Sequence, residues 1–312
     1  MAGKRRAETV DPSYGLVVLG ALLWGTLGTA GSELARTSGM SSAEISSWRL
    51  SIGGVILLAI ATWNGELRRV PRTWVAASRV AFTSVMTAVC AITFLEAIER
   101  LGVASATVVA LGLGPVFILL ASPLRGQKVP LGSSVAGSIM ALGGLVLVCG
   151  PDAFAFGADS ESIVGVAYGL VCGAAFAGMT MINRRRVEHL GPITFVGLTF
   201  CGSGLLTAAA VMLEPTNDVR LTAAAVSWLV YMAVVPTALG YVVYFAGLGR
   251  GVPASSAMIT TLLELVSAAT LAVVVLHESI GALTGAGSAL IIAAAVVMRP
   301  KAHQAEQQSL GA

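Results

Sequence analysis

Apolar segments follow one another along almost the whole chain, and each has about the 20 residues that one helix needs to cross a bilayer. Of the 312 residues, 56% are hydrophobic and only 11% are charged. A soluble domain carries about a quarter charged residues, because these residues cover its surface. The sequence therefore excludes a water-soluble enzyme and predicts an all-α integral membrane protein.

A window of membrane length predicts ten transmembrane helices with short connections. Most of the 11 prolines lie in or beside the connections between the predicted helices, where a missing backbone donor costs least. We expect residues 1–12 and 300–312 to form polar cytoplasmic tails, the second of them disordered. The predicted spans cover residues 13–31, 44–63, 74–95, 103–122, 131–149, 162–182, 192–213, 223–247, 253–276 and 281–298.

The distribution of positive charge tests these spans independently. Cytoplasmic loops of membrane proteins carry an excess of Lys and Arg. With the N-terminus inside, the inner segments hold 14 of the 19 basic residues, the outer loops hold 3 and the spans hold 2. An odd number of spans would scramble this alternation, so we predict that both termini face the cytoplasm. Since no organelle signal is visible, we expect a bacterial inner membrane.

The two halves of the chain resemble each other at an offset of 150 residues. Residues 100–105 correspond to residues 250–255, and Lys128 on the predicted inner side corresponds to Glu278 on the predicted outer side. Because each half has five spans, the second half must enter the membrane in the opposite orientation. Inverted repeats of this kind give many transporters two mirror-related states around one midplane site. The predicted repeats cover residues 13–150 and 151–299.

Short motifs occur in order along the chain: Trp24-Gly25, Trp48-Arg49, the stretch 100–115, and Leu262-Leu263-Glu264 followed by His277-Glu278. Together with the duplication they resemble the drug/metabolite transporter superfamily, EamA branch, over nearly the whole chain. Leu265 and Lys128 depart from the family pattern, which has a proline and a glutamate there. The resemblance implies a transporter of small metabolites or drugs, often an exporter, whose cavity is formed by spans one, three, four, six, eight and nine.

Glu264 is the first candidate for a substrate-binding residue. It lies near the middle of its predicted span, where a carboxylate must face a cavity, find a donor or stay protonated. We expect it to contact a substrate ammonium group or to carry a coupling proton. The alternative is a neutral glutamic acid that bonds to a neighbouring helix.

Arg49 and Arg79 are the two basic residues inside predicted spans. Each lies only a turn or two from the end of its span, so a long side chain can reach the lipid headgroups, and the sequence favours this interpretation. If either side chain points inward instead, its planar guanidinium would bind a substrate carboxylate.

Trp24 and Tyr241 are candidates for the wall of a substrate pocket. Trp24 lies in mid-span rather than at the interface where Trp collects, and its indole offers a flat apolar face and one N–H donor. Tyr241 shares a helix face with Thr237. Core packing is the alternative for both rings. Pro115 and Pro236 interrupt helices at depth, and we interpret them as helix-bending points.

Two further sets of small residues lie in the predicted spans: the four cysteines, and two stripes of glycine and alanine. Cys90, Cys149, Cys172 and Cys201 lie in apolar segments without a CxxC motif, so we interpret them as buried apolar residues rather than disulfides or metal ligands. Glycine and alanine repeat every fourth residue over 165–177 and 281–293, which is typical of helix contacts. The second stripe fits a contact within one protomer or between the protomers of a homodimer.

The sequence has no GxxxxGK[ST] loop, no HExxH motif and no acids paired at catalytic spacing. We therefore expect no ATP hydrolysis, metal or cofactor, and as partners a small-molecule substrate and the lipid bilayer rather than nucleic acid. The sequence predicts a secondary active transporter that exports small amphipathic metabolites, such as amino acids or drugs, by alternating access around a midplane cavity. The alternatives are an integral-membrane enzyme on lipid-linked substrates and a non-transporting membrane partner protein.

Overall fold

The computed structural model describes residues 12–121, 131–150, 157, 159–185, 187–213, 218–276 and 281–300. Within these ranges the regular structure is entirely helical, so the predicted all-α class is confirmed for this part of the chain. Lys128, Glu278 and most of both predicted tails lie outside the described residues.

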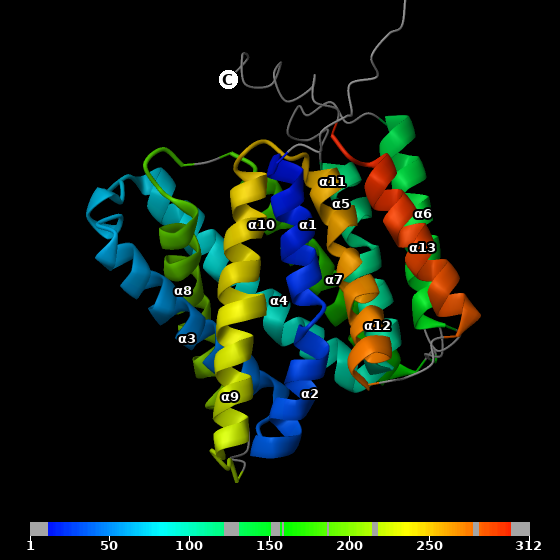
Figure 1. Ribbon diagram of the computed structural model, residues 1–312, viewed down its shortest axis with the longest axis horizontal. Helices are drawn as coiled ribbons and strands as arrows, with labels where there is room; N and C mark the ends of the chain where they lie inside the picture. The colour runs from blue at the N-terminus through cyan, green and yellow to red at the C-terminus, as the bar shows by residue number, and fades with distance from the viewer. Residues whose placement is uncertain are drawn as a thin grey trace, which may run out of the picture.

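The helices run mostly alongside one another, and the start of the first and the end of the last lie at the same end of the molecule (Figure 1). A helix satisfies its own backbone groups, which is what an apolar segment needs in lipid. In chain order they are α1 (Pro12–Trp24), α2 (Leu27–Ser38), α3 (Ser42–Trp63), η1 (Leu67–Arg69), α4 (Trp74–Thr107), η2 (Val108–Gly112), α5 (Gly114–Ala121), α6 (Leu131–Cys149), α7 (Ser160–Ile182), α8 (Pro192–Val211), α9 (Ala223–Met232), η5 (Ala233–Leu239), α10 (Gly240–Leu248), α11 (Ala254–Thr261), α12 (Leu263–Leu276) and α13 (Ala282–Val297).

Seven helical segments in the described part are long and apolar enough to cross a membrane, and three further apolar helices are shorter. The seven are Pro12–Ser38, Ser42–Trp63, Trp74–Gly102, Ser160–Ile182, Pro192–Val211, Ala223–Leu248 and Ala254–Leu271. The three shorter ones are Ser105–Ala121, Ser134–Cys149 and Ala282–Val297.

Several of these segments are interrupted, which the hydropathy pattern does not predict. The first segment breaks between α1 and α2, and π-helical turns form η2 and η5. The helix α4 also runs beyond the predicted end of its span, to Gly102, whose φ of 77° breaks the helical path. Only glycine adopts this conformation without strain, so Gly102 marks the boundary that we placed several residues earlier.

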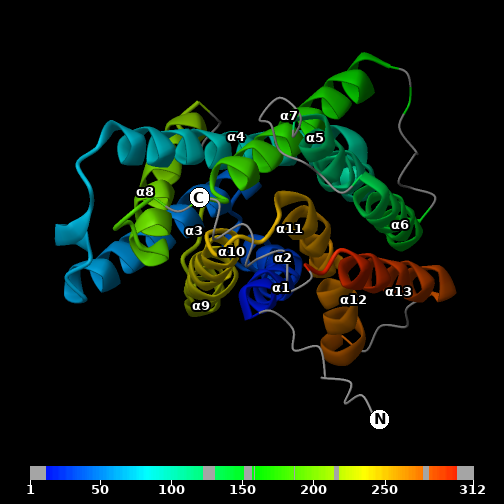
Figure 2. The ribbon, with the colours of Figure 1, turned by 90° about the horizontal axis from the view of Figure 1, so that it is seen from above.

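The closest packing joins helices from different halves of the sequence. These pairs are α3 with α8, α4 with α7, α6 with α13, and α1 with α10. Figure 2 shows α4 beside α7, and both views show α6 beside α13. Each pair combines a helix that ends before residue 150 with one that begins after it.

The two stripes of small residues have different surroundings. A Cβ added to Gly169 or Gly173 would come within 2.8 Å of Val109 or 2.5 Å of Ala110, so the stripe in α7 packs inside the protomer. A Cβ added to Gly281 or Gly285 would meet no described atom within 4 Å. The homodimer contact predicted as one alternative for this second stripe stays a prediction.

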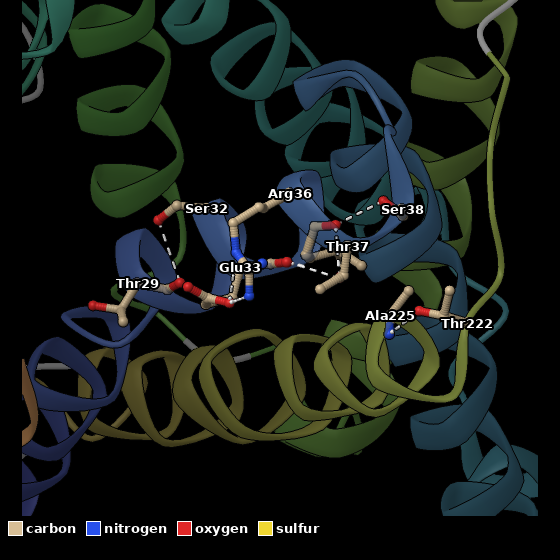
Figure 3. Close-up of polar contacts among 9 residues, drawn as sticks. Thr29, Ser32, Glu33, Arg36, Thr37, Ser38, Thr222 and Ala225 are labelled. Carbon is tan, nitrogen blue, oxygen red and sulfur yellow. Dashed lines mark hydrogen bonds and ion pairs between the residues drawn. The ribbon is translucent and has the colours of Figure 1, made fainter.

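Figure 3 shows polar contacts within α2 and at the start of α9, two segments that a backbone hydrogen bond joins. The backbone N–H of Arg220 donates to the carbonyl of Ser38 at 2.8 Å, and the Thr222 hydroxyl caps α9 by accepting from the N–H of Ala225. Glu33 and Arg36 form an exposed ion pair at 2.6 Å within α2. Exposed ion pairs of this kind contribute little to stability. The hydrogen bond from Arg220 to Ser38 is therefore the contact that holds the end of α2 beside the start of α9.

Candidate functional site

An aromatic cluster surrounds Trp24, the last residue of α1, near the middle of its candidate span. The indole is only 5% exposed. Its ring centroid lies 4.7 Å from that of Tyr241, 4.9 Å from Tyr244 and 6.1 Å from Phe176. Phe200 packs edge-on against Tyr241 at 5.0 Å. The structure therefore brings the two predicted pocket residues, Trp24 and Tyr241, into direct contact.

The break after α1 positions this cluster against α12. A Cβ on Gly25 would lie 2.5 Å from the carbonyl oxygen of Glu264 and 2.5 Å from the Cβ of Ser267, so only glycine permits this approach. The break frees the carbonyl of Leu22, which accepts a hydrogen bond from the Ser267 hydroxyl at 2.8 Å. Since an unpaired carbonyl in lipid is costly, this bond stabilises the interruption.

The indole N–H of Trp24 is buried and has no hydrogen-bond partner among the described residues. It lies close to the backbone of α10, because a Cβ on Gly240 would come within 2.9 Å of the Nε1 atom. A buried donor without an acceptor costs free energy. This N–H is therefore available to an acceptor on a bound solute.

Arg49 reaches from α3 to the π-helical segment η5. Its Nη1 donates to the hydroxyl of Thr237 at 3.2 Å, and its charge is close enough to Tyr241 and Cys90 to act on both. The side chain thus points toward the aromatic cluster, and the headgroup position that the sequence favoured for Arg49 is wrong. Span two, which supplies Arg49, is not among the spans that the family resemblance assigns to the cavity.

Pro236 explains why the backbone of η5 departs from a regular helix. Proline has no N–H and crowds the preceding turn, so the surrounding residues form a π-helical segment. This segment presents Thr237 to Arg49, and Tyr241 follows one turn later in α10. Pro115 is the second residue of α5 and lies three residues after the end of η2. The bending role of both prolines stays a prediction.

Glu264 is the second residue of α12 and follows the interruption at Leu262. Its side chain is half-buried, and its carboxyl group makes no hydrogen bond or ion pair with a described residue. The carboxyl is close enough to Tyr241 and Cys172 to act on them electrostatically. Glu264 and Arg49 therefore both act electrostatically on Tyr241, and they form no ion pair with each other.

Arg79 lies elsewhere in α4, and its side chain reaches the C-terminal end of α7. Its Nη1 donates to the carbonyls of Ile182 at 2.6 Å and Arg185 at 2.7 Å. These are carbonyls that the end of a helix leaves without a partner, and basic residues commonly satisfy them. Arg79 precedes Cys90 by 11 residues, roughly 16 Å along α4, so it is not part of the aromatic cluster. Substrate binding by Arg79 stays a prediction.

Some residues of the cluster carry no signal in the sequence. Phe176 and Phe200 are ordinary apolar residues of their spans, and helical spacing shows only which residues share a face, not what lies opposite. The Tyr244 hydroxyl shares a 3.0 Å hydrogen bond with Thr180. Among the described residues no group of three or more His, Cys, Asp or Glu side chains is arranged to hold a metal ion.

The EamA-like transporter family matches two segments of this chain, residues 12–150 and 163–299. An uncharacterized transporter of Bacillus subtilis (strain 168), YwfM, is 28% identical over 90% of this chain and 92% of its own length. The uncharacterized inner membrane transporter YicL of Salmonella typhimurium is 24% identical over 90% of this chain and 93% of its own.

One solved crystal structure has the same fold, with a TM-score of 0.77 at 20% sequence identity, over 96% of this chain and 99% of that chain. The family match covers nearly the whole chain, and the helices include seven of membrane-spanning length. The chain therefore belongs to the EamA-like transporter family and is an integral membrane transporter.

Proposed function

We propose that the chain is a secondary active transporter that exports a small zwitterionic metabolite, such as an amino acid, by alternating access. The observation that carries this proposal is that an arginine and an acidic side chain both act electrostatically on Tyr241. Arg49 and Glu264 both lie near this ring, come from different helices and form no ion pair with each other. An ionised side chain without an ion pair is costly at this depth, and a substrate that carries a carboxylate and an ammonium group would offset the cost for both residues.

The chemistry of each side chain assigns a part of the substrate to it. The planar guanidinium of Arg49 suits a carboxylate, and the indole N–H of Trp24 offers that carboxylate a further donor. Glu264 would accept from the ammonium group. The rings of Trp24, Phe176 and Tyr241 would contact an apolar side chain.

For the architecture we propose ten transmembrane helices in two inverted five-helix repeats. The two matched segments of the family and the packing of helices across the two halves support it. The helix interruptions at Leu113 and Leu262 also lie at nearly equivalent positions of the two halves. The offset of 150 residues pairs Leu113 with Leu263, the residue after Leu262. We further propose that the chain lies in a bacterial inner membrane with both termini in the cytoplasm. The relative YicL is named an inner membrane transporter, which supports the choice of membrane.

The test of the substrate uses proteoliposomes and three forms of one amino acid: the free zwitterion, its amide and its N-acetyl derivative. The amide lacks the carboxylate, and the N-acetyl form lacks the ammonium group. We would measure competition with labelled zwitterion for wild type, Arg49→Gln and Glu264→Gln. Arg36→Gln, in the exposed pair with Glu33, is the matched control for losing an arginine.

A hydrogen bond to a charged group contributes roughly 1.5–3 kcal/mol, so each missing group should weaken binding to wild type roughly 10- to 100-fold. Arg49→Gln should no longer distinguish the amide from the zwitterion, and Glu264→Gln should no longer distinguish the N-acetyl form. Arg36→Gln should retain both preferences. Equal preferences in all four proteins would overturn the assignment of the two charges.

The test of the inverted repeats compares Lys128→Cys and Glu278→Cys, each in a chain without its native cysteines. A membrane-impermeant thiol reagent should label position 278 in intact cells and position 128 only in inside-out vesicles. Labelling of both positions from the same side would contradict the inverted arrangement.

A further inference from the structure

Two cysteines from different helices lie side by side next to the aromatic cluster. The Sγ atoms of Cys90 in α4 and Cys172 in α7 are 3.2 Å apart, and both thiols are free. The described residues include all four cysteines of the chain, and Cys149 and Cys201 make no such contact with a thiol. The sequence suggested four unrelated apolar residues, but the structure brings two of them together.

The packing of α4 on α7 holds this pair in place (Figure 2). A disulfide has an S–S bond of about 2.05 Å, so the two sulfur atoms need to approach by only about 1 Å. Small rotations of two side chains provide this movement. Gly169 and Gly173, on either side of Cys172 in sequence, allow α7 to lie close to the first half of the chain.

The pair also borders the candidate binding residues. Cys90 and Arg49 are close enough to interact electrostatically, as are Cys172 and Glu264. Phe176 follows Cys172 by one helical turn and contacts Trp24. The two thiols therefore connect a helix of the first predicted repeat with a helix of the second, beside the site where the substrate would bind.

We propose that Cys90 and Cys172 form a redox-modification site, in which a reversible disulfide ties α4 to α7 and slows transport. Disulfides in reducing compartments are usually transient and sense the redox state, which fits a reversible bond of this kind. The formation of the bond is independent of the proposed function, and its effect on transport rests on that function.

The oxidant is a peroxide, which takes up the two electrons that the thiols lose. Cys90 is half-buried and Cys172 is 2% exposed, so peroxide reaches Cys90 first. The Cys90 sulfur attacks one peroxide oxygen, giving a sulfenic acid and one water. The Cys172 sulfur then attacks the Cys90 sulfur, the S–O bond breaks, and a second water leaves with the Cys172 proton. A thiol reductant restores both thiols by exchange.

The first experiment counts free thiols in the purified, full-length protein. Reduced protein is treated with hydrogen peroxide, denatured and alkylated, and its mass and its linked peptides are determined. Wild type should take up two fewer alkyl groups after peroxide, with one linked pair of peptides containing positions 90 and 172. Cys149→Ser and Cys201→Ser should show the same loss, whereas Cys90→Ser and Cys172→Ser should form no linked pair. Unchanged alkylation of wild type, or linkage at other positions, would overturn the proposal.

The second experiment measures amino acid transport by the same samples in proteoliposomes, each variant compared with its own reduced form. Wild type, Cys149→Ser and Cys201→Ser should lose most of their transport after peroxide and regain it with reductant. Cys90→Ser and Cys172→Ser should lose none. A linked pair that leaves transport unchanged would overturn the regulatory part. If the reduced wild type moves no amino acid, the proposed function fails, and the thiol count still decides whether the bond forms.

Discussion

Arg49 and Arg79 have the same side chain in similar apolar segments, and their surroundings in the structure differ completely. Arg49 bonds to one hydroxyl, that of Thr237, and acts electrostatically on Tyr241 of the aromatic cluster. Arg79 donates to the backbone carbonyls of Ile182 and Arg185 at the end of α7. The first arginine keeps donors that a substrate can use, and the second holds a helix end together. The partner, rather than the depth of the residue, distinguishes the proposed binding role of Arg49 from the structural contact that Arg79 makes.

The largest effect should come from Glu264, the acidic residue of the proposed site. If Glu264 carries the coupling proton, Glu264→Gln should abolish uptake driven by a pH gradient, because glutamine cannot exchange a proton. Downhill exchange should continue at saturating substrate concentrations, since Arg49 and the aromatic rings of the proposed site remain. Counterflow and gradient-driven uptake in the same proteoliposomes measure the two activities. A pH dependence identical to that of wild type would remove the coupling role.

The two arginines themselves provide the next test. Arg49→Gln should raise KM roughly 10- to 100-fold with little change in thermal stability, because it removes a contact to the substrate's carboxylate. Arg79→Gln should cost about 1–3 kcal/mol of stability, because the carbonyls at the end of α7 lose their charged donor. Transport kinetics and thermal unfolding in detergent distinguish the two outcomes.

The contrast between Arg49 and Arg79 is wrong if the effects on KM and stability are exchanged between the two variants. An Arg79→Gln protein of normal stability with a raised KM would place Arg79 in the binding site, as the sequence allowed. An Arg49→Gln protein that unfolds easily and binds normally would make Arg49 a structural contact.

A third prediction concerns the close approach that keeps Glu264 near the cluster. Gly25→Ala introduces a methyl group 2.5 Å from the Glu264 carbonyl and from Ser267, so α12 must shift. We expect a stability loss of about 1–3 kcal/mol and slower transport. Gly28→Ala is the matched control, since its Cβ would meet nothing within 4 Å. It should be neutral or slightly stabilising. Similar behaviour of the two variants would show that the approach at Gly25 is not needed.

The sequence predicted the bounds of the helices far better than the contacts between them. Apolar length and charge alternation are properties of one segment, and they placed most helices within a few residues of the structure. The interruption at Gly25 was missed, because close backbone contacts leave no periodic pattern. The sequence singled out Pro115 and Pro236, which lie beside η2 and inside η5, but it did not predict the π-helical form of these segments.

For the site, each candidate was chosen for its own chemistry and depth. The structure brings Trp24 and Tyr241 into contact and places Glu264 where it acts on Tyr241, while the binding role of all three stays a prediction. The sequence could not tell Arg49 from Arg79, since their difference lies in Thr237 and Ile182, which are distant in sequence. The same limit concealed the contact between Cys90 and Cys172, which are 82 residues apart.

The smallest effect should arise at the opposite end of α7 from Arg79. Asp159 caps this end by accepting from the N–H of Ser162 at 2.7 Å, and that bond lowers the pKa of the Asp159 carboxyl. A lowered pKa in the folded state means that the cap stabilises the protein above the ordinary Asp pKa and that this contribution is lost as the pH falls. Asp159→Ala should therefore lower the Tm slightly at neutral pH, and the gap to wild type should narrow under acid conditions.

Asp159→Asn is the control for this cap, because asparagine caps a helix about as well and does not titrate. Its Tm should stay near that of wild type at neutral pH. Transport by both variants should match wild type, since α7 would keep Cys172 and Phe176 in place through its packing on α4. If Asp159→Ala changed KM as much as Arg49→Gln, the two ends of α7 could no longer be regarded as purely structural, and the contrast between the two arginines would lose its physical basis.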